Sequence, residues 1–176
     1  MDLKGTKTEK NLMEAFIGES KARNKYTFFA SQARKDGYEY VAKIFDETAN
    51  NEKEHAKIWF KLLEGGTIKN TLDNLKNASE GEHYEWTDMY AKFAHEAKEE
   101  GFDSISNLFQ EIRKIEKRHE ERYNKLLFLV ENNEMFSKKE EVNWDCLNCG
   151  YILKSKKAPE KCPFCSHEKA YFESEE

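Results

Sequence analysis

The chain has 176 residues, of which 38% are hydrophobic and 36% charged, and its formal net charge is −5. This composition is lean for a large core but suits long helices with narrow apolar stripes, and the negative charge without a basic, aromatic-rich stripe argues against nucleic acid as a partner. No apolar run reaches the length of about 18 residues expected of a membrane span. The N-terminal residues also lack a hydrophobic signal region, so we expect a cytoplasmic protein.

The first part of the chain is predicted to be helical. Proline is absent before Pro159, and widely spaced glycines such as Gly37 and Gly101 mark short connections between long helices. We expect helices over about residues 6–35 and 38–64, a connection around 67–74, and two further helices that end near residues 100 and 134. Residues 135–144 are polar without a clear period and are predicted to be a linker.

In each half of the helical region, one Glu-x-x-His pair follows another glutamate at a distance of 33 or 34 residues. The six residues are Glu19, Glu52 and His55 in the first half and Glu82, Glu116 and His119 in the second. Residues three apart share a helix face. A duplicated helical hairpin that brings four carboxylates and two imidazoles together predicts a two-metal site in a helical bundle. One imidazole per metal beside carboxylates favours iron or manganese.

The repeat also separates candidate ligands from other residues. A third pair, Glu80 and His83, does not fit it, because position 83 aligns with Ser20, and we exclude it. The repeat is broken at Glu85, where the first half has Ala22. Glu85 is either a solvated charge or a fifth carboxylate ligand, and its position three residues after Glu82 favours the ligand.

Gly18 and Gly81 each precede a candidate ligand. Glycine weakens a helix by about 1 kcal/mol relative to alanine. We therefore expect these two glycines to allow a close approach of helices or side chains at the metals.

All four cysteines lie near the C-terminus, in the pattern Cys146-x2-Cys149-x12-Cys162-x2-Cys165. Two Cys-x-x-Cys pairs predict one metal held by four thiolates. The spacing alone suits either zinc or iron, but an iron centre supplies one-electron transfer beside a dimetal site. Because four thiolates complete the site, we expect His167 to face solvent.

These motifs resemble the rubrerythrin family over essentially the whole chain, through residues 18–23, 51–57, 81–85 and 116–120 and the four cysteines. The resemblance implies an all-α fold class: a ferritin-like four-helix bundle built from two helical hairpins over residues 1–138, and a rubredoxin-like domain over 139–176. It implies a diiron centre of two non-haem irons and one tetrathiolate iron, for which zinc is a possible substitute. The ligands implied for the diiron centre are Glu19, Glu52, His55, Glu82, Glu85, Glu116 and His119.

The same resemblance implies how the site works. His55 and Glu85 are expected to exchange on one iron between redox states, and Tyr26 and Tyr90 to donate hydrogen bonds to ligand carboxylates. The implied activity is a peroxidase that reduces hydrogen peroxide to water in oxidative-stress defence. Its electrons come from an external donor, a rubredoxin or an NAD(P)H-dependent reductase, and the protein is expected to be a homodimer, with electron transfer within or between subunits.

Other functions remain open at the level of sequence. A ferroxidase or iron-storing ferritin relative and a diiron oxidase share the helical ligands, although storage requires neither Glu85 nor the cysteines. A dimanganese catalase-like enzyme would need no electron donor. A zinc-ribbon adaptor with a purely structural bundle would be colourless when loaded with zinc.

Overall fold

The computed structural model describes residues 2–174. The chain divides into two compact units, residues 1–69 and residues 70–176. Among the described residues, no helix is long and apolar enough to cross a membrane.

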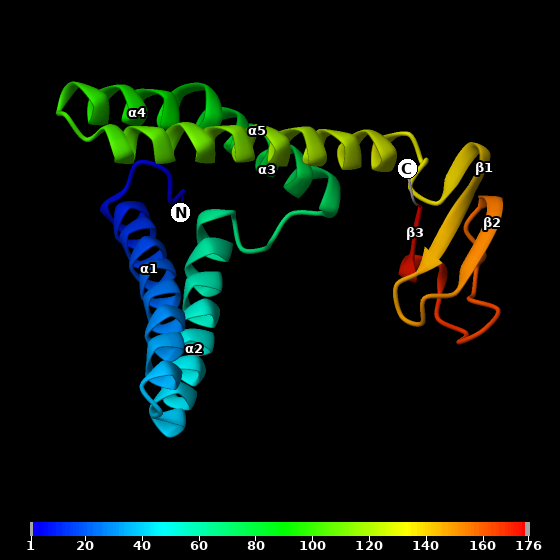
Figure 1. The fold of residues 1–176 in the computed structure, drawn as a ribbon, viewed down its shortest axis with the longest axis horizontal. Helices are drawn as coiled ribbons and strands as arrows, with labels where there is room; N and C mark the ends of the chain where they lie inside the picture. Colours follow the sequence, from blue (N-terminus) through cyan, green and yellow to red (C-terminus); the bar gives the residue numbers. More distant parts are fainter. Residues whose placement is uncertain (1, 175–176) are drawn as a thin grey trace. The chain divides into compact units, whose positions relative to one another are not determined.

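The first unit is a helical hairpin of α1 (Lys7–Lys35) and α2 (Glu39–Leu63), which lie side by side in Figure 1. The Thr6 hydroxyl accepts a hydrogen bond from the Glu9 N–H at 3.1 Å and so caps the start of α1. Between the helices, Gly37 adopts a φ of 83°, a left-handed conformation that costs glycine little. Ala30 and Ala42 are fully buried between the helices, where their small side chains allow close packing.

The second unit begins with a hairpin whose first arm has three segments. These are α3 (Thr71–Tyr84), a π-helical turn η1 (Glu85–Met89) and α4 (Tyr90–Glu99). The returning arm, α5 (Asp103–Glu131), packs against α3, η1 and α4. Side-chain hydrogen bonds join the arms, among them one from Ser79 to Asn124 and one from Ser106 to the Ala94 carbonyl, both at 2.6 Å.

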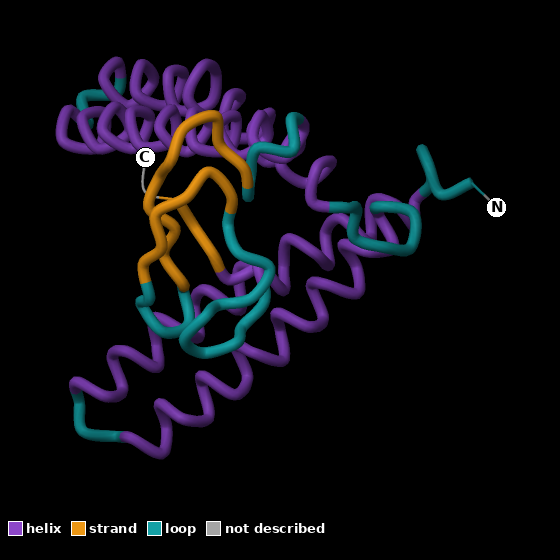
Figure 2. Tube along the Cα trace, turned by 90° about the vertical axis from the view of Figure 1, so that its right-hand side faces the viewer, coloured by secondary structure: helices purple, strands orange, loops and turns teal. Residues whose placement is uncertain are grey.

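The C-terminal part of the second unit is a small antiparallel sheet in the order β2-β1-β3. Its strands are orange in Figure 2. It contains β1 (Ser137–Cys146), β2 (Ile152–Lys157), the 3₁₀ turn η2 (Lys169–Tyr171) and β3 (Phe172–Ser174). Its core holds Trp144 and Phe172 with two of the cysteines. The Trp144 indole N–H donates to the Ser155 carbonyl at 2.9 Å, so the polar edge of this buried ring is satisfied.

The predicted fold class is confirmed, because four long helices form two hairpins and a small C-terminal strand domain carries the four cysteines. Two details of the prediction were wrong. Residues 137–144 are part of β1, not a linker, because their backbone pairs with β2 and β3. The third long helix is interrupted by the π turn at residues 85–89. The boundary between residues 138 and 139 stays a prediction.

Candidate metal centres

The first hairpin brings Glu19, Glu52 and His55 together. One ligand atom from each lies within 4.8 Å of the others. The His55 Nδ1 atom is 3.0 Å from Glu52 Oε2, which is three residues earlier on α2, and 3.9 Å from Glu19 Oε1 on α1. The pairing on α2 follows from the three-residue spacing, whereas the approach of Glu19 depends on how α1 packs against α2.

The second hairpin repeats this arrangement with Glu82, Glu116 and His119. Their ligand atoms again lie within 4.8 Å of one another. The His119 Nδ1 atom is 2.7 Å from Glu116 Oε2 and 3.6 Å from Glu82 Oε2. Each hairpin therefore presents two carboxylates and one imidazole nitrogen to a common point, a donor set that fits a divalent iron or manganese ion.

Glu85 lies at the start of the π turn, outside the group of three. The carboxylate of Glu116 and the ring of His119 interact electrostatically with it. Burial, followed by the charge of Glu116, raises the pKa of the Glu85 carboxyl above its ordinary value. Burial raises the pKa of Glu82 as well, with a further contribution from Glu116. Carboxylates crowded in this way are unfavourable without a cation, so this electrostatic setting suits a bound metal.

The two tyrosines predicted to assist the ligands lie in aromatic clusters. The Tyr26 ring stacks on Phe45 with a centroid distance of 6.1 Å, and Tyr90 packs against Phe109 at 5.9 Å. Burial, together with the charges of Glu85, Glu116 and Glu82, raises the pKa of the Tyr90 hydroxyl. The Tyr90 hydroxyl therefore interacts electrostatically with the carboxylates of the second hairpin. The role of both tyrosines as hydrogen-bond donors to ligands stays a prediction.

The two glycines beside the ligands do not serve close packing within their own hairpins. A Cβ atom built at Gly18 or Gly81 would have no heavy atom within 4 Å, apart from its chain neighbours and its own helix backbone. The expectation that they permit close helix approach is therefore wrong for the contacts inside each hairpin.

The four cysteines form a compact cluster. The Sγ atoms of Cys146 and Cys165 are 3.7 Å apart, as are those of Cys149 and Cys162. A disulfide would require about 2.05 Å. A tetrahedral metal with thiolate bonds of about 2.3 Å has sulfur atoms about 3.8 Å apart along each edge. The geometry therefore fits one metal ion held by four thiolates.

Two similar turns present these sulfur atoms. The Gly150 N–H donates to the Cys146 carbonyl at 2.8 Å, and the Ser166 N–H donates to the Cys162 carbonyl at 2.9 Å. Gly150 and Ser166 both have left-handed backbones, with φ of 72° and 62°. A hydrogen bond from the His167 backbone N–H lowers the pKa of the Cys165 thiol to about 6. Such backbone donors stabilise the thiolate that a metal requires.

The sequence predicted that His167 faces solvent, but its side chain is partly buried. Its ring lies edge-on to Tyr171 with a centroid distance of 4.7 Å. The Nδ1 atom is buried without a hydrogen-bond partner in the described part of the chain. The His167 ring therefore packs against Tyr171.

The excluded residue His83 takes part in a different contact. It joins Trp86 in binding Glu120, which lies on α5, and Arg113 of α5 binds the Trp86 backbone. Sequence reasoning missed this network, because contacts between helices leave no periodic signal. The sequence does show that Glu82 and Glu116 are 34 residues apart, whereas Glu19 and Glu52 are 33 apart.

Comparison with known proteins identifies both parts of the chain. Residues 10–127 match the family described as Rubrerythrin, and residues 144–173 match "Rubrerythrin, rubredoxin-like domain". A rubrerythrin from Porphyromonas gingivalis is 52% identical over 182 residues, which cover 97% of this chain and 91% of the relative. A rubrerythrin from Nitratidesulfovibrio vulgaris is 43% identical, with 97% and 95% covered.

Among solved structures, a partially reduced nigerythrin is 33% identical to this chain. The match covers 97% of this chain and 87% of that one, with a TM-score of 0.37. The sequence matches agree with the two kinds of donor set in the chain, a diiron carboxylate–histidine set and a rubredoxin-like four-cysteine set. The chain belongs to the rubrerythrin family.

Proposed function

We propose that this protein is a cytoplasmic peroxidase that reduces hydrogen peroxide to water in oxidative-stress defence, with electrons relayed through its tetrathiolate centre. The observation that carries the proposal is the presence of two kinds of donor set in one chain. Carboxylate–imidazole groups occur in both hairpins, and four thiolates occur in the C-terminal sheet. Iron storage needs no tetrathiolate relay, so the cysteine cluster favours a reductase.

The diiron centre would be held by Glu19, Glu52, His55, Glu82, Glu85, Glu116 and His119. One further iron would be held by Cys146, Cys149, Cys162 and Cys165. When bound and reduced, the diiron centre supplies two electrons, which with two protons convert one hydrogen peroxide molecule into two water molecules. The Nδ1 atoms of His55 and His119 already face their carboxylate partners, so little rearrangement is needed for them to bind metal.

The external electron donor is a separate protein, a rubredoxin or an NAD(P)H-dependent reductase. Leu147 and Phe164, which lie within the two Cys-x-x-Cys turns, have exposed side chains beside the thiolates. Apolar side chains in this position offer a contact surface for such a donor close to the iron.

The test is anaerobic mixing of fully reduced, iron-loaded protein with peroxide, and separately with oxygen. The absorption of the ferric tetrathiolate shows when the iron of the C-terminal four-cysteine domain has lost its electron. We expect fast reoxidation by peroxide in the wild-type protein and in Glu54→Ala, an exposed neighbour on α2. Glu52→Ala should lose this reaction while keeping its tetrathiolate iron. Slow reaction with peroxide but fast reaction with oxygen would replace the peroxidase by an oxidase or ferroxidase.

We also propose a homodimer in which the C-terminal four-cysteine domain of one subunit passes electrons to the diiron centre of its partner. The experiment combines a Glu52→Ala subunit with a Cys162→Ser subunit in verified mixed dimers. Recovery of peroxide-driven electron flow would support transfer between subunits. No recovery would mean that electrons pass within one chain.

A further inference from the structure

The π turn marks the position of an additional residue in the second hairpin. Glu19 and Glu82 are 63 residues apart, whereas Tyr26 and Tyr90 are 64 apart. The second copy of the repeat has therefore gained one residue between positions 82 and 90, and the structure places the π turn at Glu85–Met89. A π turn accommodates one extra residue within a helix.

The turn leaves one backbone carbonyl without its usual helical partner. The Tyr90 N–H donates to the Glu85 carbonyl, five residues earlier. In a regular α-helix the same N–H would donate to the Trp86 carbonyl. That carbonyl instead accepts a hydrogen bond from Arg113 Nε on α5, at 2.6 Å. Arg113 thus satisfies the acceptor that the π turn releases.

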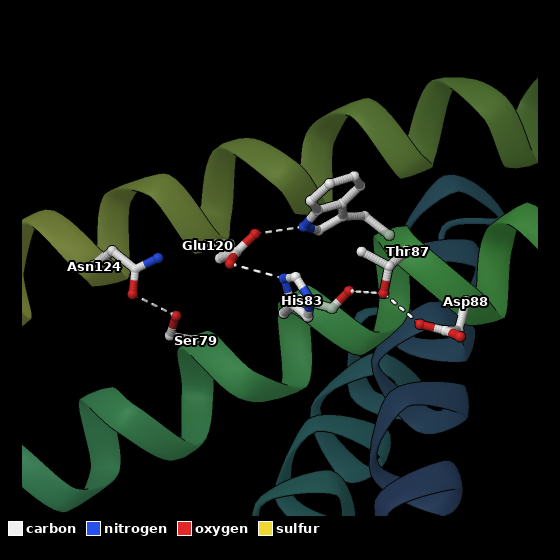
Figure 3. Close-up of polar contacts among 7 residues, drawn as sticks. Ser79, His83, Thr87, Asp88, Glu120 and Asn124 are labelled. Carbon is white, nitrogen blue, oxygen red and sulfur yellow. Dashed lines mark hydrogen bonds and ion pairs between the residues drawn. The ribbon is translucent and has the colours of Figure 1, made fainter.

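The side chain of the same residue is held from α5 as well. The Trp86 indole N–H donates to Glu120 Oε2 at 2.5 Å, and the other oxygen, Oε1, is 3.0 Å from His83 Nδ1. Figure 3 shows the Glu120 carboxylate reaching from α5 to His83. The ammonium of Lys117 lies 5.5 Å from the centroid of the Trp86 ring. Both the backbone and the side chain of Trp86 are therefore fixed to the opposite helix.

We propose that Arg113 and Glu120 are positioning residues, which hold the π turn at Trp86 and thereby fix the direction of the adjacent Glu85. The physical reason is that a π turn has poorer hydrogen-bond geometry than an α-helix and persists where other contacts stabilise it. If the turn shifts along the helix, residue 85 rotates away from Glu116 and His119. The proposal rests on the proposed role of Glu85 as an iron ligand.

The test compares Arg113→Met, which keeps the aliphatic stem but removes the donor, with Arg122→Met, a matched change at an exposed position of α5. Two measurements are made on the full-length, iron-loaded protein. Hydrogen exchange reports the amides of residues 88–91. Mössbauer spectroscopy reports the coordination of the diiron centre, with Glu85→Gln as the reference for loss of that ligand.

For Arg113→Met we expect exchange at residues 88–91 to be about tenfold faster, as suits the loss of one charge-assisted hydrogen bond. We also expect its Mössbauer spectrum to move toward that of Glu85→Gln. Arg122→Met should match the wild type in both measurements, and Arg113→Lys, which keeps a charged donor, should recover part of the loss. Trp86→Phe, which removes the indole donor to Glu120, should show the same changes in weaker form.

The possible failures have different meanings. Unchanged exchange in Arg113→Met would overturn the positioning role, whether or not the protein reduces peroxide. Faster exchange with a wild-type Mössbauer spectrum would overturn the link between the turn and Glu85. A Glu85→Gln spectrum equal to wild type would remove Glu85 from the ligands, and the inference would fail with it. Wild-type protein that fails to reduce peroxide, while Arg113→Met shows both expected changes, would count against the proposed function alone.

Discussion

Replacing Cys162 by serine tests whether metal binding or apolar packing holds the C-terminal sheet together. Cys162 is almost completely buried, and it is one of five residues in the core of that sheet. The substitution removes one ligand of the four and leaves a hydroxyl group in its place.

The magnitudes favour the metal. Among residues 137–174, the two large apolar side chains that are fully buried in this core are Trp144 and Phe172. Their burial contributes roughly 3–6 kcal/mol together. A structural zinc ion in a zinc-finger peptide contributes about 10–16 kcal/mol, and we take this as the order of magnitude for a metal held by four thiolates. We therefore expect Cys162→Ser to lose its iron and to unfold the C-terminal sheet, while both helical hairpins keep their structure.

The assay is hydrogen exchange of the full-length protein, read separately for β1, β2 and the helices, together with iron analysis of the cysteine site. Exchange in both strands should approach that of an unfolded chain. Leu147→Ser, a change at an exposed position between two ligands, is the control and should keep both iron and protection. Cys162→Ser protein that has lost the tetrathiolate iron yet retains protected amides in β1 would refute the reasoning.

Three further predictions concern stability. Gly18→Ala should raise the free energy of unfolding in urea by about 1 kcal/mol, because a Cβ there meets open space; a loss of bound iron would show that the glycine serves the metal instead. Ser166→Gly should stabilise the C-terminal sheet by about 1 kcal/mol, because Ser166 has a φ of 62°, and equal or faster exchange in β1 would contradict this. In metal-free protein, the raised pKa of Glu82 means that this carboxyl group stays protonated to a higher pH in the folded state than in the unfolded state. The free energy of unfolding should therefore fall as the pH rises above 4.5, the ordinary pKa of a glutamate. Glu82→Gln should remove part of that fall in thermal melts, and identical pH profiles for the two proteins would argue against the raised pKa of Glu82.

The sequence was sufficient for the features that depend on spacing along one helix or one turn. The pairs Glu52–His55 and Glu116–His119 share a face because their members are three residues apart. The repeat then indicated Glu19 and Glu82 as their partners across each hairpin, and the structure places them there. The cysteine spacing likewise predicted a single four-sulfur cluster.

Other features depend on contacts between segments that are distant in sequence. Residues 137–144 show no strand period, yet they form β1 because β2 and β3 supply partners for their backbone. His167 was expected to face solvent, but the packing of Tyr171 covers one side of its ring. The assignment of the seven diiron ligands and the domain boundary stay predictions.

The sequence by itself determined the helical repeat, the two carboxylate–imidazole groups and the cysteine cluster, since each follows from local periodicity or short spacing. The tertiary structure decided the π turn at Glu85–Met89 and the contacts of Trp86 with Arg113 and Glu120. The physical reason is that a one-residue insertion can be absorbed at several places along a helix. Contacts with the opposite helix determine which place it occupies.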